Sequence, residues 1–357
     1  MLRLGKALAA PLAPTAFVIL VVYALSATRE YGVPIALAVL LWFLINGIAE
    51  ALRRAPGIGP RLPRRVAQTV AATVMAGVVL GSAQIVGANL AELAGGLSVP
   101  DSPLMEHARG LTAWLGLEIE LTREALLERI PLETLIGGAL SAVGGLLGTA
   151  GLVFLFALFL LVDERFYDAK LRALVPDPRR RAELRATLSD IARQTRAYLW
   201  LMTLISAGVG AITAAACWAA GVQGAGFWGF LAFALNFIPT IGSILGVAAP
   251  GIFALLTLGD PVALVGLLTV LALTQFLAGE IVVPRVMGDR LNLSTFVIML
   301  VLVGWGAIWG PTGMFLAVPI TVILVMVAGR FEATRPLAIL LSKTGEAPRI
   351  VPPPEAP

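Results

Sequence analysis

The feature that most limits the fold of this chain is a run of 63 residues, from Ala197 to Gly259, without any Asp, Glu, Lys or Arg. A second uncharged run, from Leu291 to Gly329, is 39 residues long. About 20 apolar residues cross the roughly 30 Å hydrocarbon core of a bilayer, so the first run has room for two or three crossings. The two runs predict an all-α polytopic membrane protein, because a water-soluble core does not need them.

Composition supports this fold class and narrows the function. Of the 357 residues, 58% are hydrophobic and 13% charged, about half the charged fraction of soluble domains. The single cysteine, Cys217, and the single histidine, His107, exclude a disulfide framework or a Cys/His metal cluster. The net charge is +4, but the Arg residues flank apolar spans. This placement indicates how the chain is oriented in the membrane and not that it binds nucleic acid. We therefore expect membrane lipids as partners, and no nucleic acid, metal or cofactor.

The apolar segments predict about six full spans, at 15–27, 33–49, 66–87, 135–162, 197–220 and 262–282. The first two are interpreted as a hairpin with Arg29 in its loop, because a second apolar run follows too closely for a signal peptide. Two further segments, 226–258 and 295–329, are interrupted by Gly and Pro and predict broken helical hairpins, which can be re-entrant.

Loop charges predict the orientation. Five Arg residues, from Arg53 to Arg65, lie between the second and third spans with no acid among them; segment 88–134 has three basic and eight acidic residues, and segment 163–196 has nine basic and six acidic ones. With a cytoplasmic N-terminus, every basic block, including the C-terminal tail, lies on the cytoplasmic side. We expect both termini in the cytoplasm.

The same pattern predicts a sequence of domains. They are N-terminal spans (1–87), an extracytoplasmic amphipathic helical segment (88–134), a long span (135–162), a cytoplasmic amphipathic helix (163–196), a C-terminal membrane bundle with both hairpins (197–330) and a largely disordered cytoplasmic tail (331–357). Helix-start signals lie at Asp101 to Pro103 and at Asp177 and Pro178. The helix after Asp177 is interpreted as resting on the anionic inner leaflet, with a gating helix as the alternative.

The first hairpin carries the most informative pattern. Its arms, about 14 and 15 residues, reach only about 21–23 Å, which is less than the hydrocarbon core. Pro239 lacks a backbone donor and Gly242 is permissive, so residues 236–243 are predicted to be non-helical. Asn236, Thr240 and Ser243 lie at this break, where they could bind a solute or satisfy freed carbonyl groups.

The second hairpin is predicted to break at 304–313, which contains Gly310, Pro311 and Gly313, and again at Pro319. Paired membrane segments interrupted by Gly and Pro are the best sequence indication of a transporter's binding region. Ordinary proline kinks and helix packing through glycine are the alternative.

Few ionisable residues flank these hairpins. Asp260 before Pro261 is explained as a helix cap. Glu280 lies near the end of an apolar span and is a candidate for proton coupling, with pairing to Arg285 or Arg290 as the alternative. Phosphate-loop, metalloprotease and serine-hydrolase motifs are absent from the sequence, so we predict that the chain is not an enzyme.

Three segments together resemble the autoinducer-2 exporter (AI-2E) family, and within it the autoinducer-2 exporter branch. They are 235–246 (LNFIPTIGSILG), 283–288 (VPRVMG) and 304–321 (GWGAIWGPTGMFLAVPIT), and the tail 337–342 (LAILLS) also fits. The resemblance implies a multispan protein of the bacterial inner membrane, often a homopentamer, that exports a small hydrophilic molecule. Some relatives exchange sodium or other cations for protons.

The family motifs match this chain at Asn236, Pro239, Gly242, Pro284, Arg285, Gly288, Pro311, Gly313 and Pro319. The resemblance implies that the glycines and prolines shape the hairpins. Asn236, Thr240, Ser243 and Glu280 are candidate solute or ion contacts. Pro284, Arg285, Gly288 and Arg290 form a candidate gating loop on the cytoplasmic side.

We therefore predict a secondary exporter of a small polar solute, whose two hairpins line the pathway and move as one half against the N-terminal spans. A sodium/proton antiporter is the alternative within transport. From another class, a non-transporting membrane scaffold or assembly partner is the alternative, although a scaffold does not need two broken helices.

Overall fold

The computed structural model describes residues 16–17, 19–57, 59, 62–96, 132–287, 293–329, 332, 334–343 and 345, and its regular elements there are helices. The longer ones are α2 (Arg29–Arg54), α3 (Arg64–Gly96), α6 (Leu132–Asp163), α8 (Pro178–Ala219), α10 (Ile241–Thr257), α11 (Pro261–Phe276) and α13 (Thr295–Ala328). The shorter ones are η2 (Glu164–Phe166), α7 (Tyr167–Leu174), α9 (Ala225–Leu235), η3 (Leu277–Val282), α12 (Val283–Met287) and α14 (Arg335–Leu341).

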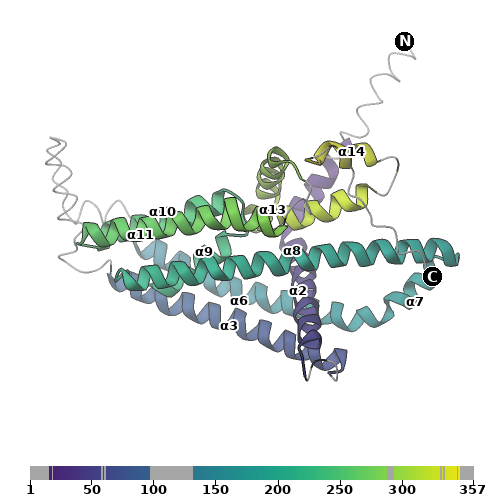
Figure 1. Ribbon diagram of the computed structural model, residues 1–357, viewed down its shortest axis with the longest axis horizontal. Helices are drawn as coiled ribbons and strands as arrows, with labels where there is room; N and C mark the ends of the chain where they lie inside the picture. Colours follow the sequence, from purple (N-terminus) through teal and green to yellow (C-terminus); the bar gives the residue numbers. More distant parts are fainter. Residues whose placement is uncertain are drawn as a thin grey trace, which may run out of the picture. The chain divides into compact units, whose positions relative to one another are not determined.

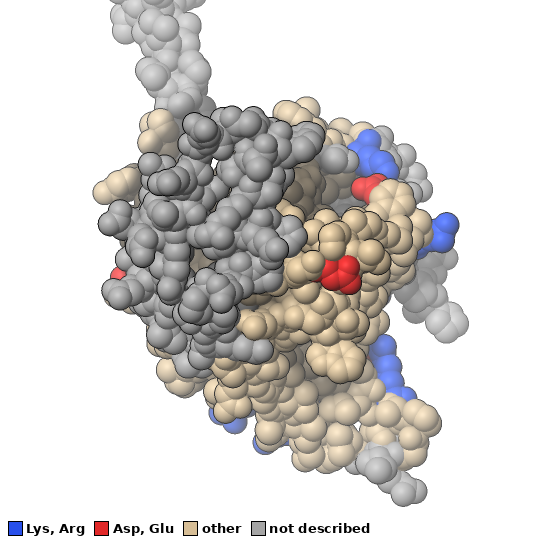
Figure 2. All heavy atoms as spheres, turned by 90° about the vertical axis from the view of Figure 1, so that its left-hand side faces the viewer, with Lys and Arg blue, Asp and Glu red and all other residues tan. Residues whose placement is uncertain are grey.

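Five helical segments among the described residues are long and apolar enough to cross a bilayer. They are Arg29–Arg54, Arg64–Asn89, Pro178–Ala219, Pro261–Val286 and Phe296–Ala328. The described surface in Figure 2 is almost entirely uncharged, with only isolated acidic and basic side chains. Large apolar side chains such as Trp218, Val262 and Phe296 are more than 70% exposed. The predicted fold class, an all-α polytopic membrane protein, is confirmed.

The chain divides into two compact units. Unit 1 comprises Met1–Phe43, Leu152–Thr195 and Asn292–Pro357, and unit 2 comprises Leu44–Gly151 and Arg196–Leu291. The sequence interpretation placed both hairpins in one C-terminal bundle, 197–330. The structure instead assigns the first hairpin to unit 2 and the second to unit 1. The hypothesis that both hairpins move together against the N-terminal spans stays a prediction.

Unit 2 is built around α9, α10 and α11, which follow one another along the chain and pack in that order (Figure 1). Trp228 of α9 packs against Phe253 of α10, and both join a buried cluster with Leu267 and Leu271 of α11. The same cluster buries Cys217 completely, so this thiol packs inside the unit. This apolar cluster holds the base of the first hairpin.

Helix α8 joins two segments that the sequence interpretation separated at 196 and 197. It runs for 42 residues without interruption. No Pro occurs in it after Pro178, and no Gly before Gly208, so the junction at 196 and 197 contains no helix-breaking residue. At 1.5 Å per residue it is about 63 Å long, roughly twice the hydrocarbon thickness, so its charged N-terminal part extends beyond the bilayer. The charged part is thus continuous with a span and is not a separate surface helix.

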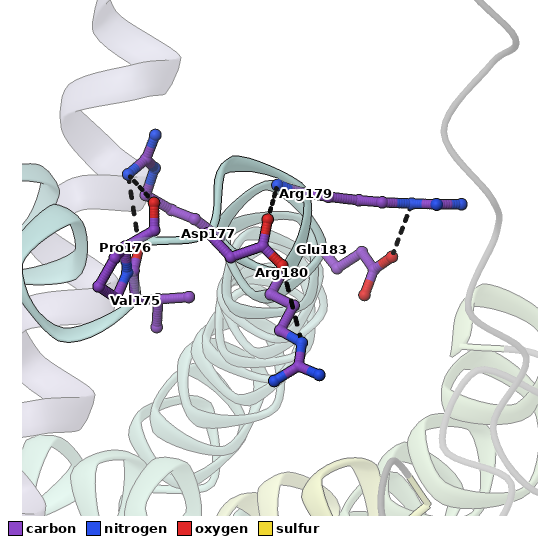
Figure 3. Close-up of polar contacts among 7 residues, drawn as sticks. Val175, Pro176, Asp177, Arg179, Arg180 and Glu183 are labelled. Atoms are coloured by element: carbon purple, nitrogen blue, oxygen red, sulfur yellow. Dashed lines mark hydrogen bonds and ion pairs between the residues drawn. The ribbon is translucent and has the colours of Figure 1, made fainter.

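The start of α8 confirms the predicted cap. The Arg179 backbone N–H donates to Asp177 Oδ1 at 3.0 Å (Figure 3). Pro178 occupies the first helical position. Asp177 also pairs with Arg180, and Glu183 with Arg179. Asp260 caps α11 in the same way, accepting a hydrogen bond from the Val262 N–H at 2.9 Å. The other predicted helix start, at Asp101, lies outside the described residues.

Two terminal regions differ from the prediction. The loop expected around Arg29 is not formed: Thr28 alone separates two helical segments, and α2 begins at Arg29, with Glu30 favourably placed in its first turn. In the tail expected to be largely disordered, residues 335–341 form α14, which packs on α13 and buries Ala338. Backbone pairing of Leu293 with Ser342 fixes its end.

Candidate functional site

The first hairpin breaks between α9 and α10, as predicted, but over a shorter stretch. Helix α9 ends at Leu235 and α10 begins at Ile241, so Gly242 and Ser243 already lie in the first turn of α10. The arms have 11 and 17 residues, about 16 and 26 Å, and both are shorter than the roughly 30 Å core. The prediction of short apolar arms is confirmed.

Thr240 is the strained residue of this break. Its φ of 64° and ψ of −58° make it the single non-glycine residue with positive φ in the described part of the chain. The Ile241 N–H donates to the Pro239 carbonyl at 2.7 Å, which closes a three-residue γ-turn around Thr240. This form of the γ-turn is rare and strained, especially for a β-branched residue. Backbone strain of this kind concentrates at functional sites.

Local hydrogen bonds satisfy the carbonyl groups at the break. The Leu235 carbonyl accepts from Ile238 N–H at 2.8 Å, and the Ile238 carbonyl accepts from Gly242 N–H at 2.9 Å. The Thr240 carbonyl accepts from Ile244 N–H at 3.1 Å. At these residues the backbone, rather than a side chain, supplies the hydrogen-bond donor. The side chains of Thr240, exposed, and Ser243, half-buried, make no hydrogen bond within the described residues.

Gly242 allows the two arms to meet. A Cβ at this position would overlap the carbonyl oxygen of Leu235. The two residues are seven positions apart, which is about 10 Å along a straight helix, so this contact exists only because the chain reverses. Gly242 is therefore required for close approach rather than for a special backbone angle.

A seam of small residues joins α8 to α9 and ends in a polar contact at the break. A Cβ on Gly210 of α8 would lie 2.7 Å from the Gly229 carbonyl oxygen, and one on Gly229 would lie 2.6 Å from the Cβ of Ala214. Small residues at membrane helix interfaces permit this approach. One turn before Gly210, the fully buried Ser206 accepts a hydrogen bond from Asn236 Nδ2 at 2.9 Å.

Asn236 is thus anchored by a side chain that the sequence interpretation did not identify. Ser206 lies inside the uncharged run, thirty residues earlier, and the sequence carries no signal that pairs it with Asn236. The bond orients the Asn236 amide at the end of α9. The tip of the first hairpin therefore combines a fixed amide with the hydroxyl groups of Thr240 and Ser243, and none of these is charged.

The second hairpin reverses at Gly310. Its φ of 65° and ψ of −149° belong to a region that essentially only glycine adopts, and the rest of Thr295–Ala328 is helical. Pro311 follows as the first residue of the second arm, where a missing N–H costs little. A Cβ on Gly313 would overlap the carbonyl oxygen of Trp305, eight residues earlier. The predicted break is confirmed, but it is confined to Gly310 rather than spread over 304–313.

Pro319 does not interrupt the hairpin a second time, so that prediction is wrong. It is buried inside the second arm, and the single non-helical residue of the segment is Gly310. Membrane helices accommodate proline because neighbouring groups and small local adjustments satisfy the carbonyl that it leaves free.

The tip of the second hairpin is bound to the N-terminal segment within unit 1. Trp309 Nε1 donates to the Leu25 carbonyl at 3.0 Å, and the Trp309 ring lies against Gly32, where a Cβ would be 3.3 Å from the ring. Leu25 lies four residues before Arg29, where α2 begins. The indole therefore binds a carbonyl group next to the junction of two helical segments. The ring of Trp305 packs beside that of Trp309, with their centroids 5.0 Å apart.

Glu280 lies on a π-helical turn, η3, between α11 and α12. The Val283 N–H donates to Ala278 O, five residues back, and this wider turn relieves the clash that Pro284 would cause in an α-helix. Glu280 is exposed and forms no ion pair within the described residues, so the predicted pairing with Arg285 is not formed. Pro284 and Arg285 lie exposed on α12, whereas Gly288 and Arg290 lie outside the described residues.

Sequence reasoning also missed Gln275 of α11. Its side chain is 6% exposed, and neither Nε2 nor Oε1 has a hydrogen-bond partner in the described part of the protein. It packs against α10, where a Cβ on Gly246 would lie 2.5 Å from Nε2. The signal in the sequence is that Gln275 is the one carboxamide residue in the apolar segment 261–279. Because a carboxamide has no charge, it does not stand out as an ionisable residue would.

This arrangement offers uncharged polar groups at breaks in apolar helices and little for catalysis. Within the described residues, no three His, Cys, Asp or Glu side chains are grouped as metal ligands. Helical hairpins interrupted by Gly and Pro, with polar groups at the interruption, define a membrane transporter.

Comparison with known proteins identifies the family. The AI-2E family transporter pattern matches residues 12–332, so the chain belongs to this family. The AI-2 transport protein TqsA of Escherichia coli (strain K12) is 30% identical over 317 residues, which cover 88% of this chain and 90% of that protein. The putative transport protein YhhT of the same organism is 34% identical over 230 residues, 63% and 64% of the two chains. The putative transport protein YueF of Bacillus subtilis (strain 168) is 25% identical over 306 residues, 80% of each.

Proposed function

We propose that this transporter exports a small polar solute of the autoinducer-2 kind across the bacterial inner membrane. One observation carries the proposal: the first hairpin ends in a strained turn at Thr240, inside a segment of 63 residues without charge. Backbone of this form at membrane depth is tolerated where protein or a water-filled cavity surrounds it. The uncharged amide and hydroxyl groups of Asn236, Thr240 and Ser243 suit a neutral hydrophilic solute.

Flux into proteoliposomes tests this function. Purified protein is reconstituted, and uptake of autoinducer-2 is compared with protein-free liposomes and with liposomes that contain the Gly310→Ala variant. We expect saturable uptake by the wild-type protein alone, because the variant cannot form the second hairpin without strain. Uptake no faster than in protein-free liposomes, from protein that remains folded, would contradict the proposal.

The proposal includes a location and an assembly. We place the segment between α2 and α3 and the N-terminal part of α8 in the cytoplasm, supported by the Arg residues in both. A cytoplasmic N-terminus also requires two crossings before Arg53 and stays a prediction, because no loop separates the helical segments on the two sides of Thr28. We also propose a homo-oligomer, supported by the resemblance to a family that often forms pentamers. Light scattering of the detergent-solubilised protein and labelling of terminal cysteines in oriented vesicles test these two points separately.

A second candidate function is cation/proton antiport, favoured by Glu280. This carboxylate lies on a π-helical turn of an apolar segment, and π-turns are frequent at functional sites. A carboxylate at membrane depth that forms no ion pair within the described residues is a candidate proton carrier. The test adds sodium to vesicles with a fluorescent proton-gradient indicator. A sodium response that disappears in Glu280→Gln supports antiport, and an identical response in both proteins contradicts it.

A further inference from the structure

Gln275 is an unusual residue to bury in a membrane protein. With 6% of its surface exposed, it has an amide donor and an amide acceptor that are both unpaired within the described structure. Burying an unpaired polar group destabilises a protein, and a leucine of similar size would avoid this cost. The other buried unpaired atoms in the described residues are single hydroxyls, on Thr195 and Thr321. Among these residues, Gln275 alone has two separate unpaired polar atoms, a nitrogen and an oxygen.

The position of Gln275 connects it with the first hairpin. Its Nε2 lies against Gly246 of α10, at a place that only a residue without a Cβ leaves open. Gly246 follows Gly242 by four residues, so the two glycines share one face of α10, about 6 Å apart along the axis. Gly242 is the residue that seats the turn against Leu235. The unpaired carboxamide is therefore about one helical turn from the break, and both belong to unit 2.

The chemistry of the site indicates a class of ligand. A carboxamide donates through Nε2 and accepts through Oε1, which matches a hydroxyl group or adjacent hydroxyl and carbonyl groups on a ligand. The other polar groups at the break, from Asn236, Ser206 and Thr240, are also neutral. A fully charged solute would lose its hydration here without gaining a counter-charge. The site thus favours uncharged solutes that carry several hydroxyl or carbonyl oxygens.

We propose that Gln275 hydrogen-bonds the transported solute next to the turn at Thr240 and selects neutral, hydroxyl- and carbonyl-bearing molecules. This inference rests on the proposed export function and specifies its substrate class. In this account, Gly246 is a positioning residue, because the absence of its Cβ sets where the amide lies.

The test measures autoinducer-2 flux and ligand-induced thermal stabilisation for four proteins: wild type, Gln275→Leu, Gly246→Ala and Gly266→Ala. Gln275→Leu removes both hydrogen-bonding atoms at nearly constant volume. Gly246→Ala keeps the amide but displaces it. Gly266→Ala is the matched control, since Gly266 lies on α11, a methyl group there would meet no atom within 4 Å, and the residue belongs to no proposed site.

We expect Gln275→Leu to unfold at a temperature equal to or above that of the wild type, because it no longer buries unpaired polar atoms. Its KM for autoinducer-2 should rise about tenfold, the factor expected when one hydrogen bond is lost. Gly246→Ala should raise the KM in the same direction, whereas Gly266→Ala should leave it unchanged. Autoinducer-2 should stabilise the wild type against heat, but not Gln275→Leu.

Two failures are distinguishable. If the wild type neither transports nor is stabilised by autoinducer-2, the proposed function for this solute fails, and the inference fails with it. If the wild type does both and Gln275→Leu has the same KM and thermal shift, export stands and the role of Gln275 is overturned. If the leucine variant does not fold, Gln275→Met provides the same comparison, because its unbranched side chain has a similar shape and lacks both amide atoms; an unchanged KM would again overturn the role.

Discussion

Replacing Thr240 with glycine should stabilise the protein, although glycine usually destabilises. Thr240 holds φ of 64° and ψ of −58°, and such backbone strain costs of the order of 1–3 kcal/mol. Glycine adopts these angles freely but loses about 0.5–1 kcal/mol more through chain entropy. Because Thr240 is exposed, truncation removes little packing. The net expectation is a gain of about 0.5–2 kcal/mol in the free energy of unfolding.

Alanine at the same position separates strain from side-chain chemistry. Thr240→Ala keeps the Cβ that makes the turn unfavourable, so Thr240→Gly should be more stable than Thr240→Ala. At Thr269, an exposed position within α11, the order should reverse, with alanine about 1 kcal/mol more stable than glycine. Denaturant unfolding in mixed micelles, followed by tryptophan fluorescence, measures all four variants. If glycine is less stable than alanine at both positions, the strained turn is not present in the protein.

The remaining predictions concern other contacts of the fold. Gly310→Ala should lose about 1–3 kcal/mol of stability from backbone strain alone. Gly304→Ala, where a methyl group would meet open space, should lose none. Equal denaturant midpoints for these two variants would exclude the reversal at Gly310. Gly313→Ala should be worse than Gly310→Ala, because its methyl group meets backbone, and an expression and monodispersity screen would show this. Trp309→Phe should cost about 1 kcal/mol for the lost bond to a backbone carbonyl, measured by the same unfolding assay. Asp177→Ala should cost about 0.5–2 kcal/mol as a lost helix cap, and Asp177→Asn should restore most of that stability.

The membrane fold was predictable because its signals are local. The uncharged runs give the spans, and Asp followed by Pro fixes the helix starts at Asp177 and Asp260. Glycine and proline also located both hairpin breaks, because a residue without a Cβ or without an N–H limits the backbone directly. The exact break residue was harder to predict. Gly304, Gly306, Gly310 and Gly313 all permit a break, and the structure places the reversal at Gly310, the one among them that precedes a proline.

Contacts between distant residues were not predictable from this sequence. Nothing local pairs Ser206 with Asn236 or Trp309 with Leu25, which is 284 residues away. The assignment of the two hairpins to different units also reflects contacts between residues distant in sequence, and within unit 1 the indole of Trp309 attaches the second hairpin to the N-terminal segment. Gln275 was overlooked because a carboxamide carries no charge, and only its burial without partners makes it notable.

The most direct test of the account measures water at the two hairpin tips. In a Cys217→Ala background, Ser243→Cys and Thr312→Cys are treated with a small, charged, thiol-specific reagent. Leu324→Cys on the apolar surface is the reference for a thiol in lipid. Arg179→Cys at the start of α8 is the reference for a thiol in water. We expect the two tip cysteines to react more slowly than Arg179→Cys, far faster than Leu324→Cys, and to be protected by autoinducer-2. Tip cysteines that react as fast as Arg179→Cys without protection would show that both breaks are surface turns in water, and would contradict a solute pathway at these sites.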